Sequence, residues 1–184
     1  MQTVVERRKP EGLLDHLALA ITTCGVGYLP LMPGTFGSLV GVAIYVLISS
    51  AFSSFRYTPE SVEPETLVAG IHAIIMVAFV GLILLGVWAS GRSIELLGSG
   101  DPPEAVIDEV IGQLTVFLFI PFATSWLIIA AGFGFFRLFD IWKPFPIDRL
   151  QMLPGGLGIC VDDVGAGICA GACLSVVYAV SLWV

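Results

Sequence analysis

The chain has 184 residues, of which 57% are hydrophobic and only 12% charged, and its mean hydropathy is +0.94. Soluble proteins carry about 25% charged residues, so this composition excludes an ordinary soluble domain, and the length excludes a large multidomain enzyme. A net charge of −7 argues against nucleic-acid binding, since little here could neutralise a run of phosphates. We expect a single domain over residues 1–184 in a lipid bilayer, with residues 1–12 as a basic N-terminal tail.

The N-terminal region resembles a signal peptide, because basic residues 7–9 precede the apolar segment Leu13–Ile21. Asp15 and His16 interrupt that segment, however, and it leads into a loop rich in Gly and Pro. We therefore favour an uncleaved N-terminus on the cytoplasmic side, with a helix from Asp15 lying at the membrane interface.

Four stretches contain no charged residue, and each is longer than the roughly 20 residues that cross a hydrocarbon core. They are His16–Phe55, Thr66–Gly91, Val110–Phe136 and Val164–Val184. We interpret these stretches as the membrane-embedded part of the chain.

The first two stretches predict two spanning helices. Gly25–Ser38 contains four Gly and two Pro residues, so we expect a loop there and the first spanning helix over Leu39–Phe55. The acidic, proline-containing segment Arg56–Glu65 is typical of an external loop. Leu67–Ser90 is the clearest spanning segment.

The third stretch, Val110–Phe136, predicts either one crossing or a helical hairpin that enters and leaves on one side of the membrane. Pro121 near its middle and the basic residues that follow it, Arg137, Lys143 and Arg149, favour the hairpin. Val164–Val184 predicts the last membrane helix, rich in the small residues that allow close helix packing.

The scarce acids form clusters. Asp101, Glu104 and Asp108 have the spacing of one helix face, with Glu109 beside them, and Asp101 before Pro102 has the pattern of a helix N-cap. Asp108 and Glu109 cannot be caps. They border an uncharged stretch, where a buried carboxylate is costly unless a cation pairs with it.

Two further clusters follow. Arg137, Asp140 and Lys143 are spaced by three, either as surface ion pairs or as a phosphate-binding pair of bases around an acid. Asp162 and Asp163 lie between glycines just before the last expected helix, where capping explains one Asp but hardly two. Oxygen ligands from several segments are the donor set that Mg²⁺ prefers.

The Gly-rich loop adds a possible anion site. Backbone N–H groups of small residues that open a helix bind phosphate, here at Gly34, Thr35, Gly37 and Ser38. With the acidic clusters, this pattern predicts a metal-assisted reaction on a phosphate ester. The two histidines (His16 and His72) and the four cysteines (Cys24, Cys160, Cys169 and Cys173) are interpreted as packing residues, without a zinc site or a disulfide framework.

Four segments resemble the phosphatidylglycerophosphatase A family of bacterial membrane lipid phosphatases. They are Gly27–Ser38, Val106–Gly112, Phe136–Ile147 and Gly155–Gly167, with Phe-Arg-x-x-Asp-x-x-Lys-Pro and Gly-Ile-x-x-Asp-Asp as the specific motifs. The resemblance implies an all-α integral membrane helical bundle with an acidic active site at the cytoplasmic face of the bacterial inner membrane. It also implies Mg²⁺-dependent conversion of phosphatidylglycerophosphate to phosphatidylglycerol.

The resemblance also implies roles for single residues. The catalytic carboxylates would be Asp108, Glu109, Asp140, Asp162 and Asp163, with Glu109, Asp162 and Asp163 as metal ligands. The phosphate would be held by Gly34, Thr35, Gly37, Ser38, Arg137 and Lys143. Either Asp108 or Asp140 would position an attacking water, and a phospho-aspartyl intermediate is the other route.

Three alternatives remain open at this point. One is a phosphatase for another lipid phosphate, such as phosphatidic acid or a polyprenyl phosphate. The second is a small ion-coupled transporter, which the position of the acids at segment ends disfavours. The third, a structural subunit, leaves the clustered acids unexplained. The sequence does not predict the oligomeric state.

Overall fold

The computed structural model describes residues 5–55, 64–122 and 125–183. Within these ranges all regular structure is helical, which confirms the expected all-α class. The helices are α1 (Gly12–Thr23), α2 (Pro33–Phe55), α3 (Pro64–Leu97), α4 (Ile107–Phe117), α5 (Trp126–Trp142), α6 (Ile147–Leu150) and α7 (Gly156–Ser181). Residues 56–63 of the expected external loop lie outside the described residues.

Three helices are long and apolar enough to cross a membrane, over Pro33–Phe52, Val68–Leu97 and Gly156–Ser181. None of the most apolar window of α3 is buried inside the protein, as expected of a helix whose surroundings are lipid. The chain is therefore a membrane protein with a helical membrane-embedded part, as the uncharged stretches predict.

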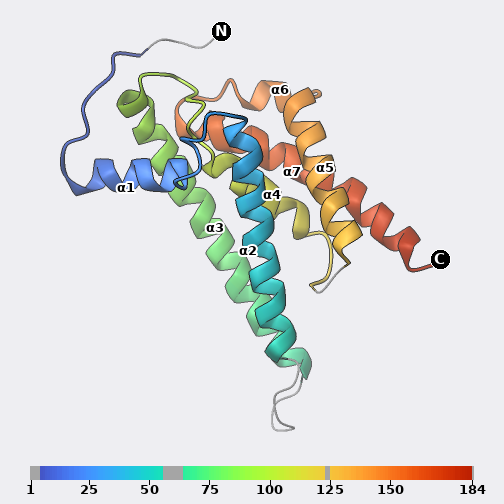
Figure 1. The fold of residues 1–184 in the computed structure, drawn as a ribbon. Coiled ribbons are helices and arrows are strands. Elements are labelled where there is room, and N and C mark those ends of the chain that lie inside the picture. Colours follow the sequence, from blue (N-terminus) through green and yellow to red (C-terminus); the bar gives the residue numbers. More distant parts are fainter. Residues whose placement is uncertain (1–4, 56–63, 123–124, 184) are drawn as a thin grey trace.

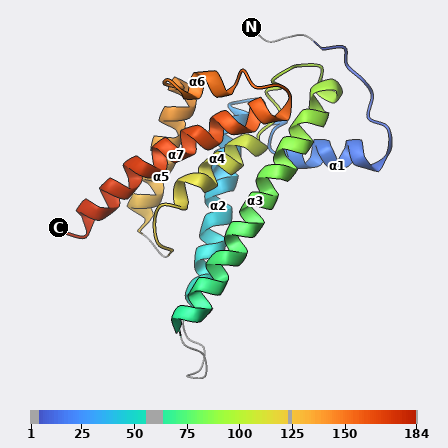
Figure 2. The same cartoon turned by 180° about the vertical axis from the view of Figure 1, so that it is seen from behind.

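The short helix α4 lies at the centre of the bundle (Figures 1 and 2), and ten of its eleven residues are buried. It packs chiefly against α7 on one side and α2 on the other. Because α4 begins with Asp108 and Glu109, this central position brings two carboxylates into the interior of the protein.

The stretch Val110–Phe136 is divided between two helices, α4 and α5, as the expected hairpin requires. The turn between them contains Pro121, and Ser125 caps α5 by accepting a hydrogen bond from the backbone N–H of Ile128. Helix α5 returns the chain toward the end of the bundle where α4 began (Figure 1). Asp140, near the end of α5, is consequently close enough to Glu109 on α4 to raise its pKa.

The expected loop over Gly25–Ser38 is partly wrong, because α2 begins at Pro33 rather than Leu39. Proline suits the first position of a helix. Gly37 and Gly41 lie on the face of α2 that meets α4: a Cβ at Gly37 would lie 2.8 Å from the Val106 carbonyl oxygen, and one at Gly41 would lie 2.9 Å from Gln113 Cβ. These glycines permit close helix packing instead of breaking the helix.

The expected start of the last helix at Val164 is also wrong, because α7 begins at Gly156. Gly156 packs so closely on α3 that a Cβ there would overlap the Val87 carbonyl oxygen. Asp162 and Asp163 consequently lie in the second turn of α7, inside the helix rather than ahead of it.

The helix expected around Asp101, Glu104 and Asp108 begins only at Ile107, so Asp101 is not its N-cap. The preceding turn packs against the end of α1 instead, where the Val106 N–H donates to the Thr22 carbonyl oxygen at 2.8 Å. This tertiary hydrogen bond replaces the expected first helical turn.

Candidate active site

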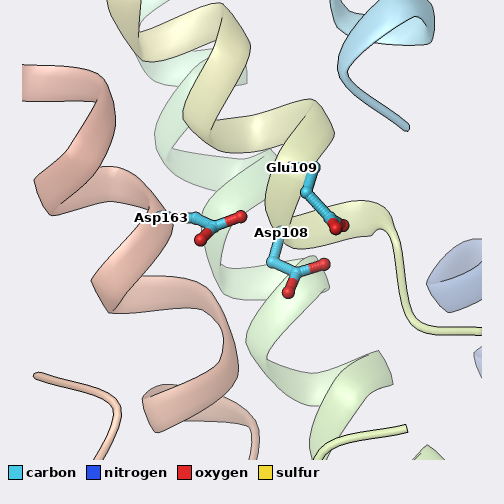
Figure 3. A group of neighbouring side chains, drawn as sticks. All are labelled: Asp108, Glu109 and Asp163. Carbon is cyan, nitrogen blue, oxygen red and sulfur yellow. The ribbon is translucent and has the colours of Figure 1, made fainter. Parts of the chain in front are cut away.

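Three carboxylates converge where α4 meets α7. Asp108 and Glu109 lie in the first turn of α4, and Asp163 lies on α7 with its side chain directed toward them (Figure 3). One oxygen from each of the three lies within 4.8 Å of the others. We call these residues the acidic trio.

The acidic trio is largely buried and incompletely bonded. Asp108 and Asp163 are 9% and 2% exposed, and Glu109 is half-buried. Asp108 Oδ1, Glu109 Oε2 and Asp163 Oδ2 are each buried atoms with no hydrogen-bond partner among the described residues. Buried carboxylate oxygens without partners are costly, and oxygens are the ligands of hard divalent cations. The chemistry of this set therefore fits a metal ion.

Two basic residues, Arg137 on α5 and Lys143 at its C-cap, lie beside the trio. Lys143 Nζ lies 2.5 Å from Asp162 Oδ2, 3.8 Å from Asp163 Oδ1 and 3.9 Å from Asp140 Oδ1. Arg137 Nη1 lies 2.6 Å from Asp140 Oδ2. The structure thus brings together all five acids that the sequence analysis selected as catalytic, but Asp162 faces Lys143 rather than the trio.

The surroundings raise the pKa values of the acids on α4. Burial is the main cause that raises the pKa of Asp108 well above its ordinary value, and the negative charges of Glu109 and Asp163 add to it. Burial likewise raises the pKa of Glu109. Burial acts to lower the pKa of Lys143, but Asp163 and Asp162 outweigh it, so this pKa lies above its usual range. Lys143 is therefore a stable cation.

The charges of the site do not balance. Five acids (Asp108, Glu109, Asp140, Asp162 and Asp163) face two bases (Arg137 and Lys143), so three formal negative charges remain. By contrast, the buried Asp15 has two arginine partners, Arg8 at 2.7 Å and Arg92 at 2.6 Å. The excess negative charge at the site is the second observation that fits a bound cation.

Four of the residues expected to hold phosphate (Gly34, Thr35, Gly37 and Ser38) lie in the first turns of α2, beside Glu109. A Cβ at Gly34 would overlap the Glu109 carboxylate. The Ser38 hydroxyl donates to the Gly34 carbonyl oxygen at 3.0 Å and accepts from Arg137 Nη1 at 3.3 Å. Thr35 Oγ1 is buried, with no hydrogen-bond partner in the described part of the chain. Gly37, Ser38 and Arg137 thus lie close to the acids, and Lys143 contacts Asp162.

Two buried polar groups, one next to the site and one on α1, were given no role by the sequence analysis. Gln113 is fully buried in α4 and the carboxylate of Asp15 is fully buried beneath Arg8 and Arg92. Gln113 is the first polar side chain inside the uncharged stretch that starts at Val110, which is the signal that could have identified it. The two discounted histidines each contact a backbone carbonyl of their own helix, His16 that of Gly12 and His72 that of Val68.

The fold and the site together define a helical membrane protein with a cluster of carboxylates beside two bases, Arg137 and Lys143. The family model of phosphatidylglycerophosphatase A matches residues 19–178, and the chain belongs to that family. The protein is accordingly a phosphatase.

Relatives support this assignment. Phosphatidylglycerophosphatase A of Haemophilus influenzae is 34% identical over 177 residues, which cover 95% of this chain and 94% of the relative. The protein of the same name from Escherichia coli is 30% identical over 151 residues, covering 82% and 76%. A Bacteroides thetaiotaomicron protein with the provisional name phosphatidylinositol-3-phosphatase is 30% identical over 168 residues, covering 89% and 91%. No solved structure matches the chain at a significant level.

Proposed function

We propose that the protein hydrolyses the terminal phosphate monoester of phosphatidylglycerophosphate, giving phosphatidylglycerol and phosphate, with Mg²⁺ as its cofactor. The buried acidic trio beside Arg137 and Lys143 is the observation that carries this proposal. The substrate is the one named in two of the relatives. The Bacteroides relative makes a phosphoinositide monoester the second candidate.

Asp108, Glu109 and Asp163 would hold the cation, because they supply unpartnered oxygens that converge. When bound, Mg²⁺ would offset phosphate charge and lower the pKa of water. Asp162 was also expected among the ligands; its contact with Lys143 supports a role in orienting that base.

Other residues of the chain would bind the phosphate and transfer protons. Arg137 and Lys143, with Ser38 and Thr35, would bind the phosphate oxygens. Asp140 or a carboxylate of the trio would take a proton from the attacking water as its oxygen bonds to phosphorus. The bond between phosphorus and the glycerol oxygen then breaks, and that oxygen takes up a proton. A carboxylate that attacks phosphorus itself is the alternative route.

We further propose that the site faces the cytoplasm at the inner membrane. The basic residues of the described chain (Arg7, Arg8, Lys9, Arg92, Arg137, Lys143 and Arg149) belong to the segments at one end of the bundle, the end that holds α1, α6 and the site (Figure 1). Short cytoplasmic segments of membrane proteins carry an excess of Lys and Arg, which supports this orientation. A transport function would instead favour acids along a pathway through the membrane.

The test is phosphate release by purified protein in mixed micelles, with Mg²⁺ or with EDTA. The substrates are phosphatidylglycerophosphate, phosphatidic acid, phosphatidylinositol 3-phosphate and a polyprenyl phosphate. We expect the highest kcat/KM for phosphatidylglycerophosphate and no release in EDTA. Faster hydrolysis of another lipid would reassign the substrate, and undiminished release in EDTA would reject the cofactor.

A further inference from the structure

Gln113 is a polar side chain that the proposed reaction does not use. It lies in the centre of α4 and is 0% exposed, and within residues 5–55, 64–122 and 125–183 neither its Nε2 nor its Oε1 atom has a hydrogen-bond partner. Buried polar atoms in proteins nearly always have a partner, and an amide with none at either atom is rare. Packing alone would be served better by an apolar residue of similar size.

The position of Gln113 relates it to Glu109. The two residues are four apart on α4, so they lie on the same face of the helix. Side chains in a helix lean toward its N-terminus, which brings the Gln113 amide over the turn that carries Glu109. Glu109 Oε2 is itself buried and has no hydrogen-bond partner among the residues that the structure describes.

Helix α2 closes this face. Gly34 lies against the Glu109 carboxylate and Gly41 lies against Gln113 Cβ, at 2.9 Å from a Cβ built on Gly41. Ser38, which binds Arg137, lies between these two glycines on α2. Polar groups of Glu109, Ser38 and Gln113 therefore share the seam between α2 and α4, next to the site.

We propose that Gln113 is a positioning residue of the metal centre, whose amide holds Glu109 Oε2 through one bound water. This contact would keep the Glu109 carboxylate turned toward Asp108 and Asp163. Groups that orient metal ligands in this way typically affect metal affinity by about 10–100-fold. The inference rests on the proposed metal centre, but it concerns a residue that touches neither the substrate nor the cation.

The test is the affinity of the purified protein for Mn²⁺, measured by electron paramagnetic resonance, together with its melting temperature. In Gln113→Leu we expect Mn²⁺ to bind about tenfold more weakly or worse. The melting temperature of the metal-free variant should stay close to that of the metal-free wild type, because a hydrogen bond contributes little net stability and leucine fills a similar volume. Gln113→Met, which keeps the length of the side chain, should behave alike.

Thr115→Val is the matched control. Thr115 is buried on the same helix and donates to the Ile111 carbonyl oxygen, on the side that faces Gly167 of α7. The Thr115→Val variant should bind Mn²⁺ with the affinity of the wild type. Wild-type Mn²⁺ affinity in both Gln113 variants would overturn the inference, as would failure of both to fold. Wild-type protein that binds no Mn²⁺ would instead overturn the proposed metal centre.

Discussion

Lys143 Nζ lies 2.5 Å from Asp162 Oδ2, and the backbone of Lys143 is in the left-handed conformation with φ of 43°. Lys143 directly follows α5 as its C-cap, and its backbone N–H donates to the Phe139 carbonyl oxygen. A side chain other than glycine rarely adopts this conformation. The turn thus places one ammonium group among Asp140, Asp162 and Asp163 at the cost of backbone strain.

This strain gives a prediction for Lys143. Both Lys143→Ala and Lys143→Gly should lose most phosphatase activity and stability, because Asp162 is left buried without its cation. The Gly variant should nevertheless be more stable than the Ala variant by about 1 kcal/mol, since glycine adopts positive φ freely. Thermal unfolding in detergent measures the difference. Equal stability of the two variants would show that the left-handed turn does not form in solution.

A second prediction concerns the packing of Gly34 on Glu109. In Gly34→Ala the new Cβ would overlap the Glu109 carboxylate, which must then leave its present position beside Asp108 and Asp163. We expect the Mg²⁺ concentration that gives half-maximal activity to rise at least about tenfold, since misplaced ligands lose affinity by this order. The loss of stability should be small, because the end of a flexible side chain can shift.

Gly81→Ala is the matched control for this prediction. A Cβ at Gly81, in the middle of α3, would meet nothing within 4 Å. Activity should be unchanged and stability should rise by about 0.5–1 kcal/mol, the usual gain from replacing a helical glycine. If Gly34→Ala and Gly81→Ala reach half-maximal activity at the same Mg²⁺ concentration, Glu109 is not a ligand.

A third prediction is the pH dependence of Asp15. Hydrogen bonds from Arg8 and from the Glu11 N–H, together with Arg92, hold the pKa of this carboxyl well below its ordinary value. A lowered pKa in the folded state stabilises the protein above the unfolded-state pKa of about 3.9, and this contribution is lost as the pH falls below it.

The measurement is the melting temperature of the wild type and of Asp15→Asn between pH 7 and pH 2. At pH 7 the Asn variant should melt at a lower temperature, because Arg8 and Arg92 lose their charged partner. The gap should narrow below about pH 4. A gap that stays constant over the whole range would mean that Asp15 contributes no charge to stability.

The membrane helices could be predicted from the sequence because charge is excluded from hydrocarbon, which locates α2, α3 and α7 from composition alone. The first and last residues of these helices could not be predicted in this way. Whether Gly34 or Gly156 breaks a helix or permits close packing depends on the partner helix, and that partner is visible only in the fold. The turn before Ile107 was misread for the same reason, since the Val106 N–H of this turn donates to the Thr22 carbonyl oxygen on α1.

The site could be predicted as a set of acids but not as a geometry. Adjacent residues on a helix point about 100° apart. Because Asp162 and Asp163 lie inside α7, Asp162 meets Lys143 while Asp163 joins Asp108 and Glu109. In the loop that the sequence analysis expected there, both could have faced one cation.

The most direct test of the account compares Mg²⁺-dependent phosphate release from phosphatidylglycerophosphate by the wild type, Asp163→Asn and Asp148→Asn. Asp148 is an exposed acid on α6 outside the site, so its variant should retain wild-type activity. Metal assistance supplies several kcal/mol of transition-state stabilisation, so Asp163→Asn should lose at least about a hundredfold in kcat/KM. Folded Asp163→Asn protein with the activity of Asp148→Asn would contradict the assignment of the acidic trio as the catalytic centre.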